Sequence, residues 1–416
     1  MANIVERRKI NLLILGVMKK IIYFSYPAEG HVNPSIKLCK MLDQKNLKII
    51  YYTLPDQFEK FREFKNLELR AYPHENILNK YLAEAGTMSH KFGYTQYMLF
   101  DCTRNLIEYA IDEVKKEKPQ LIMNDVFAMW GKIAAKYLKI PMAIFSCVFL
   151  MDPSISKKSG NKPPISELLP LLSDWPTMLK AMRIKRKLDK KYDRLTDSPM
   201  NFLSDQGALT VVTSTKVFHP DGELFGSNVY FIGNDVSQYK TDEVTEKDII
   251  FVSIGTMYEN KTIWNKVLRS VSDFGYKIVM VAYNNNIKYI DQSLVRDKVK
   301  IYNKLSLEEY QKYIRRAKVF INHGGMNSVT MSIMYHTPML VCPNTFERHN
   351  TGKVVEKTKC GLTFKNQNFS EEMMRNAVAE LINNAEVSKG LEKISNEFLK
   401  TSNCNEVVEE ILNKLC

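Results

Sequence analysis

Short apolar runs alternate with segments of helical apolar spacing along the first half of the chain. The strand candidates are residues 20–25, 47–53, 121–124, 140–146 and 208–214. Between them, residues 35–43 and 130–138 have helical spacing, and Asn33 and Pro34 are a suitable N-cap and first helical position. Strand, helix and strand in this order predict a parallel sheet covered by helices on both faces.

The second half repeats this pattern after a polar stretch, residues 234–247, which we interpret as a linker. Its strand candidates are 248–254, 277–282, 298–302, 319–322 and 339–342, and its helices are expected at 308–316 and from Met326 onward. The pattern predicts an α/β fold of two Rossmann-like, doubly wound parallel-sheet domains that face each other across a cleft. Ligands bind such sheets at the carboxyl ends of the strands.

The expected domain boundaries follow from these patterns. Residues 18–233 are expected to form a first domain and residues 248–395 a second domain, and a helix in 396–416 is expected to pack back on the first domain. Residues 1–17 are an N-terminal appendage. Its apolar run, residues 10–17, is too short for a membrane span and lacks a cleavage site, which argues against a signal peptide.

Composition narrows the class of protein. The 416 residues are 45% apolar and include seven scattered cysteines with no C-x-x-C pair, which favours a reduced, cytoplasmic protein without a metal site. The net charge of +13 comes without a nucleic-acid-binding motif. The densest basic stretch runs from Lys180 to Arg194; a solvated helix is the favoured interpretation, and weak contact with an anionic membrane is the alternative.

A candidate anion site lies between residues 323 and 328, which read His-Gly-Gly-Met-Asn-Ser. An apolar run leads into two glycines and then into a helical pattern. Glycine lets the backbone approach a phosphate, and the first turn of a helix offers free N–H groups and a positive dipole end. His323, Asn327 and Ser328 add side-chain donors to the same place.

A candidate general base lies directly after the first apolar run. His31 follows Gly30 there, and an imidazole can take a proton from a hydroxyl near neutral pH when a partner fixes its tautomer. Asp125 ends another strand and is a suitable partner. Both residues have an ordinary alternative, since a loop histidine is often a surface residue and an aspartate after a strand is often a helix cap.

The order of motifs resembles family 1 glycosyltransferases, of the bacterial macrolide-glycosyltransferase type related to UDP-glycosyltransferases. The motifs are Gly30-His31-x-x-Pro34, Asp125 before Trp130-Gly131-Lys132-x-Ala134, Val212-Thr213-Ser214 to Phe231-Ile232-Gly233, Phe251-Val252-Ser253-Ile254-Gly255-Thr256, and His323-Gly324-Gly325-Met326-Asn327-Ser328 to Pro338 and Pro343. The resemblance extends from about Lys20 to the C-terminus. It is weak across residues 55–120 and 150–205.

The resemblance implies the GT-B architecture, in which residues 18–233 would bind the acceptor and residues 248–395 the nucleotide-sugar donor. It also implies a mechanism. His31 would deprotonate an acceptor hydroxyl with Asp125 as its partner, and the sugar would transfer by direct displacement with inversion. Neither a metal nor a cofactor is implied besides the nucleotide-sugar co-substrate. The donor-binding residues implied are Gly255, Thr256, His323, Gly324, Gly325, Asn327, Ser328, Glu347 and Arg348.

Three positions depart from the family pattern. Met331 stands where a glutamate usually holds the ribose hydroxyls. The acidic-Gln pair that grips the sugar is Glu347-Arg348 here, and the arginine either prefers a sugar carrying a carboxylate or pairs with Glu347. The Trp-x-Pro-Gln element that flanks the base is not recognisable near residues 303–309, so backbone groups are expected to hold the base.

The expected function is therefore transfer of a hexose, with UDP-glucose as the first candidate donor, to a hydroxyl of a small and fairly apolar acceptor such as a macrolide or a phenol. Residues 94–100 and 145–151 either line the acceptor pocket or belong to ordinary core. The alternatives are a transferase that acts on a lipid or cell-envelope acceptor at a membrane surface, and a catalytically silent nucleotide-sugar-binding protein. Retention of both His31 and Asp125 argues against the silent protein.

Overall fold

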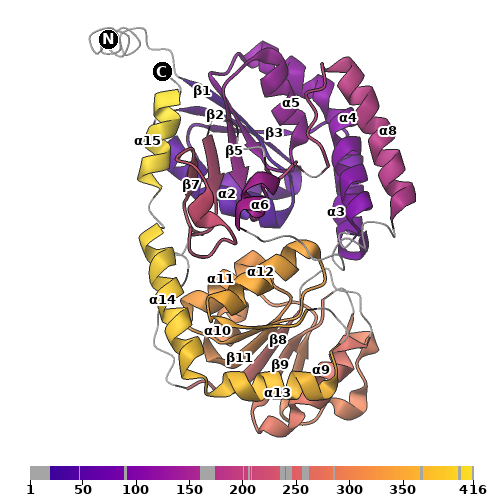
Figure 1. Ribbon diagram of the computed structural model, residues 1–416, viewed down its shortest axis with the longest axis vertical. Helices are drawn as coiled ribbons and strands as arrows, with labels where there is room; N and C mark the ends of the chain where they lie inside the picture. The colour runs from indigo at the N-terminus through magenta and orange to yellow at the C-terminus, as the bar shows by residue number, and fades with distance from the viewer. Residues whose placement is uncertain are drawn as a thin grey trace.

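A computed structural model describes residues 19–45, 47–88, 91–159, 174–199, 201–204, 207, 209–234, 239, 246–254, 262–283, 286–365, 369–401 and 404–414. The appendage, most of the linker, Gly255 and Thr256 lie outside these residues. Figure 1 shows two α/β units, one above the other, joined along one side by the last helices.

The first sheet contains seven strands in the order β3-β2-β1-β4-β5-β6-β7, and every adjacent pair is parallel. Its central strands are mostly apolar and, apart from Lys20, buried, as expected for strands covered on both faces. The strands are β1 (Lys20–Phe24), β2 (Lys48–Thr53), β3 (Leu67–Ala71), β4 (Leu121–Asp125), β5 (Met142–Ser146), β6 (Leu209–Val212) and β7 (Val229–Phe231).

The second sheet contains six parallel strands in the order β10-β9-β8-β11-β12-β13. These are β8 (Ile249–Ser253), β9 (Lys277–Val281), β10 (Val299–Tyr302), β11 (Ala317–Asn322), β12 (Met339–Val341) and β13 (Gly361–Thr363). In both sheets the chain starts in the middle, builds outward to one edge and then crosses to the other side. Two doubly wound parallel sheets confirm the predicted fold class.

Helices cover both sheets. Those of the first unit are α2 (Glu29–Asp43), α3 (Glu75–Met88), α4 (Phe92–Glu117), α5 (Met129–Leu138), α6 (Pro153–Ser159) and α8 (Trp175–Lys191). Those of the second are α9 (Ile263–Val271), α10 (Leu307–Arg316), α11 (Met326–Met334), α12 (Phe346–Lys357) and α13 (Glu371–Ile382), followed by α14 (Ala385–Thr401) and α15 (Asn405–Lys414). No helix in the described part of the chain is both long and apolar enough to cross a bilayer.

One predicted helix start is wrong. α2 begins at Glu29, with Ala28 as N-cap, so Asn33 and Pro34 lie inside the helix instead of starting it. The chain turns into the helix directly after β1, because His31 and Val32 both donate their N–H groups to the Ala28 carbonyl. His31 is therefore held in the first turn of a helix and not in a loop.

The C-terminal segment joins the two units. α14 and α15 are separate helices, and the expected boundary at 395 and 396 falls inside α14. The Phe398 ring on α14 lies 5.7 Å from the Phe218 ring of the first unit, and α15 packs against α2 (Figure 1). In addition, the Asn234 amide donates to the Thr330 hydroxyl at 2.8 Å, where both side chains are buried. Buried contacts of these kinds fix how the two sheets face each other.

Candidate active site

The first unit places His31 and Asp125 side by side at the carboxyl edge of its sheet. Asp125 is the last residue of β4, the neighbour of β1, and His31 stands one turn into the helix that follows β1. Nδ1 of His31 lies 2.9 Å from Oδ2 and 3.0 Å from Oδ1 of Asp125. The sequence therefore correctly indicated that these two residues meet.

The geometry fixes how the imidazole is used. A carboxylate only accepts hydrogen bonds, so Nδ1 donates to Asp125, and the neutral ring keeps its lone pair on Nε2. The Phe127 backbone N–H donates to Oδ1 of Asp125 at 2.8 Å and fixes the carboxylate. The Asp125 side chain is 1% exposed and that of His31 is 12% exposed, so the histidine is the member of the pair that solvent or a ligand reaches.

Electrostatics favours proton uptake by His31. Burial alone lowers the pKa of the imidazole, but the Asp125 carboxylate, together with Cys147, outweighs burial and holds that pKa well above its usual range. The rings of Tyr26 and Phe127 flank the imidazole at 5.1 and 4.8 Å between centroids. The imidazole is therefore a base whose protonated form is stabilised by Asp125 and whose ring lies between two aromatic side chains.

Cys147 is a neighbour of the pair that the sequence did not single out. It directly follows β5, the strand next to β4, and it is buried. Burial raises the pKa of its thiol, and His31 lowers it. The Glu347 carboxylate of the second unit raises that pKa further. Among the described residues, His31, Asp125 and Cys147 offer nitrogen, oxygen and sulfur atoms within 4.8 Å of one another, a set that could hold a metal ion.

The second unit places the Gly-Gly turn at the carboxyl end of β11. Gly324 has a φ of +87°, and a Cβ there would lie 2.9 Å from Cγ1 of Val341 and 3.0 Å from the Arg348 carbonyl oxygen. Gly325 is the N-cap of α11, which starts at Met326 as the sequence predicts. The N–H groups of that first turn have no acceptor within the helix and carry its positive dipole end.

Side chains around this turn supply further donors. The hydroxyls of Ser328 and Tyr310 lie 3.1 Å apart, while Asn327 is exposed at the helix start. Burial and then the charge of Arg348 hold the pKa of His323 well below its usual range. A hydrogen bond with the Ser253 backbone has the opposite, smaller effect on that pKa. Burial and Arg348 thus favour the neutral form of the His323 imidazole, which can donate a hydrogen bond to a phosphate.

The departures from the family pattern also have structural counterparts. Met331 is buried in the core of the second unit and presents no polar group. Arg348 Nη1 donates to Oδ1 of Asn344 at 2.5 Å, and Thr345 caps α12 by accepting from the Arg348 N–H. Glu347 is exposed on the first turn of that helix. Figure 1 shows α11 and α12 on the side of the second unit that faces the first, and the charge of Glu347 acts on Cys147 of the first unit.

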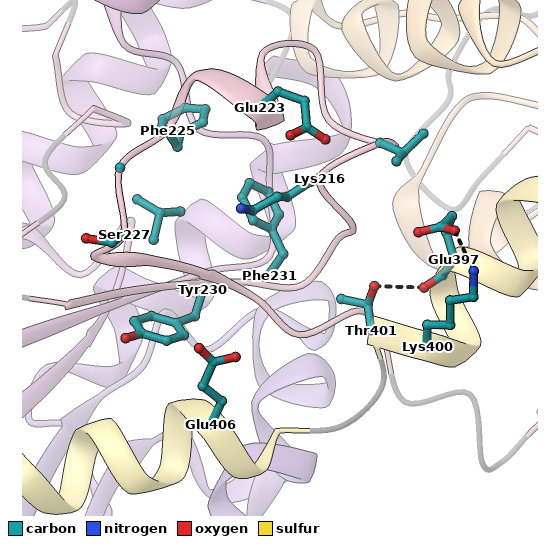
Figure 2. A pocket seen from close by; sticks show the side chains of 13 residues that line it. Lys216, Glu223, Phe225, Ser227, Tyr230, Phe231, Glu397, Lys400, Thr401 and Glu406 are labelled. Atoms are coloured by element: carbon teal, nitrogen blue, oxygen red, sulfur yellow. Dashed lines mark hydrogen bonds and ion pairs between the residues drawn. The ribbon is translucent and has the colours of Figure 1, made fainter.

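A cavity of about 870 Å³ lies away from these residues, between the segment around β7 and helices α14 and α15 (Figure 2). Its charged lining residues include Lys216 and Glu223, and Lys400, which pairs with Glu397 at 3.1 Å. None of the expected site residues that the structure describes lines it. The described site residues instead gather at the facing carboxyl edges of the two sheets.

Comparisons with known proteins agree with this arrangement. Residues 265–414 match the model of the family described as erythromycin biosynthesis protein CIII-like, C-terminal domain. The uncharacterized UDP-glucosyltransferase YojK of Bacillus subtilis is 24% identical over 95% of this chain and 97% of its own length. The demethyllactenocin mycarosyltransferase of Streptomyces fradiae is 19% identical over 95% of this chain and 87% of its own.

Solved structures show the same fold. The glycotransferase of kitacinnamycin superposes with a TM-score of 0.78 at 15% identity, covering 96% of this chain and all of that one. CalG4, the calicheamicin glycosyltransferase, superposes with a TM-score of 0.69 at 17% identity, covering 96% of this chain and 98% of its own. The two facing parallel sheets define a protein of the GT-B class. Within that class, the family model and the relatives together support a family 1 glycosyltransferase that acts on nucleotide sugars.

Proposed function

We propose that this protein is an inverting, metal-independent glycosyltransferase that moves a hexose from a nucleotide diphosphate sugar to a hydroxyl of a small, fairly apolar acceptor. The observation that carries the proposal is the contact of His31 with Asp125 at the carboxyl edge of the first sheet, with the Gly-Gly turn at the carboxyl edge of the second. A base on one side and an anion site on the other are the two requirements of such a transfer.

In the proposed step, Nε2 of His31 takes the proton of the acceptor hydroxyl while its oxygen attacks the anomeric carbon of the sugar. The bond between that carbon and the diphosphate oxygen breaks, and the nucleoside diphosphate leaves with the bonding electrons. Asp125 stabilises the resulting imidazolium. The α11 N–H groups and the Ser328 hydroxyl meet the charge on the departing diphosphate, and Gly255 and Thr256 complete the donor site in this proposal.

UDP-glucose is the donor that we propose first, because relatives such as YojK are named UDP-glucosyltransferases. A macrolide or a phenol is the proposed acceptor class, supported by the match to the family described as erythromycin biosynthesis protein CIII-like. Arg348 introduces a second donor possibility. Its planar guanidinium matches a carboxylate in a bidentate contact, so a sugar carrying a carboxylate is a direct competitor of glucose.

The test is transfer by the purified protein with a panel of UDP- and TDP-sugars, including UDP-glucose and UDP-glucuronic acid, against a mixed set of macrolides and phenols. Mass spectrometry should detect an acceptor heavier by one sugar, and NMR should show the inverted anomeric configuration. Addition of EDTA should leave the rate unchanged. An Arg348→Gln variant should lower the rate with UDP-glucuronic acid relative to UDP-glucose if the arginine selects the carboxylate.

A catalytically silent nucleotide-sugar-binding protein is the second candidate, favoured by the apolar, buried Met331 at the position of the family's ribose-binding glutamate. It predicts binding of UDP without any transfer. The paired base argues against it, because a protein that only binds a nucleotide sugar has no use for His31 and Asp125 in this geometry.

A further inference from the structure

Helix α8 presents a face that the protein leaves uncovered. The helix packs on α4 through Ala181, Ile184 and Leu188, spaced three and four residues apart. Its nine exposed residues lie away from that contact: Trp175, Pro176, Leu179, Lys180, Arg183, Arg186, Lys187, Lys190 and Lys191. Figure 1 shows α8 at the outer margin of the first unit, beside α4.

The charge of this face is of one sign. Six of its nine exposed residues are Lys or Arg, and none is acidic. The one acidic residue of the helix, Asp189, is partly buried and pairs with Lys185 at 2.6 Å. On the neighbouring helix, Glu108 pairs with Lys191 at the end of the face. Most of its cationic groups are therefore available to an anionic surface.

The N-terminal end of the face is apolar. Trp175 is 55% exposed and Leu179, one helical turn further on, is 41% exposed. Tryptophan favours the membrane–water interface, and Lys and Arg are attracted to anionic headgroups, so an exposed tryptophan and leucine at the end of a row of Lys and Arg suit a lipid surface. Nucleic acid would use the cations but would gain little from the apolar pair, so the composition of the face favours lipid.

The apolar end of this face also lies at the same end of the first unit as His31, the proposed base. Asp174, which precedes the helix, accepts a hydrogen bond from the Tyr94 N–H in the first turn of α4. One turn later the Met98 sulfur accepts from the Tyr26 hydroxyl, and the Tyr26 ring stands 5.1 Å from that of His31. A lipid surface that reaches Trp175 would thus lie at the same end of the domain as the acceptor side of the site.

From these observations, we infer that the exposed face of α8 docks the protein on anionic lipid bilayers, with Lys and Arg against the headgroups and Trp175 and Leu179 in the interface. The docking goes beyond the transfer reaction and does not depend on it, because lipid binding is measured without donor or acceptor. It brings the site close to the layer in which an apolar acceptor concentrates.

The test uses the full chain and two kinds of vesicle, phosphatidylcholine alone and phosphatidylcholine mixed with phosphatidylglycerol. We expect sedimentation with the mixed vesicles at low salt only, and release in moderate salt. Arg183→Glu combined with Arg186→Glu, and Trp175→Ala combined with Leu179→Ala, should each weaken binding by about tenfold or more. Lys312→Glu combined with Lys393→Glu is the matched control, since it changes net charge equally on exposed residues of other helices.

Trp175 is also a built-in reporter. The chain has three tryptophans, and Trp130 and Trp264 are fully buried, so a blue shift of emission on adding mixed vesicles reports on Trp175.

The inference is overturned if the wild type does not bind at low salt, if the control pair weakens binding as much as the α8 pair, or if bound protein shows no shift. Stronger binding to DNA than to vesicles, with Trp175 and Leu179 dispensable, would replace lipid by nucleic acid as the partner. Unchanged circular dichroism spectra confirm that the variants fold.

Discussion

Asp125 holds both of its carboxylate oxygens within 3.0 Å of Nδ1 of His31. The two residues are 94 positions apart in the chain and meet because β1 and β4 are adjacent parallel strands that end at the same edge. The contact leaves Nε2 as the nitrogen that can receive a proton. The expected effects of Asp125→Asn and of pH on catalysis depend on this contact between Asp125 and His31.

Asp125→Asn should lower kcat while leaving donor binding nearly unchanged. The amide is close in size to the carboxylate but carries no charge to stabilise the imidazolium, so we expect a loss of about 10²-fold or more, within the range of general base catalysis. The check is a comparison of kcat with the dissociation constant for UDP. A variant that loses UDP binding to the same extent would indicate a structural role for Asp125.

The pH dependence of kcat/KM should follow the protonation of His31. Only the neutral imidazole is a base, and its folded pKa is raised, so kcat/KM should rise as pH increases through that raised value. Asp125→Asn removes the carboxylate that raises the pKa and leaves the burial that lowers it. The rising limb of the profile should therefore move to lower pH in the variant. A limb that stays in place would mean that another group titrates.

Gly324→Ala should weaken both stability and donor binding. A side chain at φ +87° costs about 1–2 kcal/mol, and the new Cβ would also meet Val341 and the Arg348 carbonyl at 3.0 Å or less. Gly275→Ala is the matched control, because Gly275 has a φ of +78° but nothing within 4 Å of its Cβ position. In the control, urea unfolding should show the cost of backbone strain alone, and UDP titration should show no loss of affinity. Equal effects on UDP binding would contradict a special role for the turn.

Acid stability should depend on Glu117. Lys20 and then Arg70 hold the pKa of Glu117 at about 2, against the opposing effect of burial. An unfolded glutamate titrates near pH 4.3, so this contribution is complete above that value and is lost as pH falls from there through about 2. Glu117→Gln should lower the free energy of unfolding by about 1–3 kcal/mol at pH 7.

The loss in Glu117→Gln should shrink in urea titrations as pH is lowered toward 2, because the wild-type carboxyl then becomes protonated in the folded protein too. The control is Glu386→Gln, because Glu386 also pairs with lysines, Lys359 and Lys389, but on the exposed surface. It should leave stability unchanged, since solvent screens such pairs. A loss in Glu117→Gln that is the same at both pH values would rule out the ion pairs as its cause.

The fold was predictable because its central strands are continuous apolar runs with helical patterns between them. β3 was missed because each of its five residues is only partly buried, which leaves no apolar run, and β7 and β13 are three-residue strands at sheet edges. The start of α2 was missed because Pro34, normally a first helical residue, stands inside that helix. Such positions are decided by tertiary contacts and not by local preference.

The site was predictable where function depends on backbone geometry. The Gly-Gly turn and the start of α11 follow from glycine and helix chemistry alone. Cys147 was missed, although it follows the apolar run at 140–146 and so had to lie at the same sheet edge as Asp125. The low pKa of His323 was not predictable, because it arises from burial and from Arg348, which is 25 residues away in the chain.

The most direct test of the central claim is the transfer rate of His31→Ala against wild type at saturating donor, followed by mass spectrometry of the glycosylated acceptor, with UDP affinity measured in parallel. We predict a loss of about 10²–10⁴-fold in rate with nearly unchanged UDP affinity. A variant that retains its rate within about threefold would contradict the assignment of His31 as the general base, since it falls far short of that range.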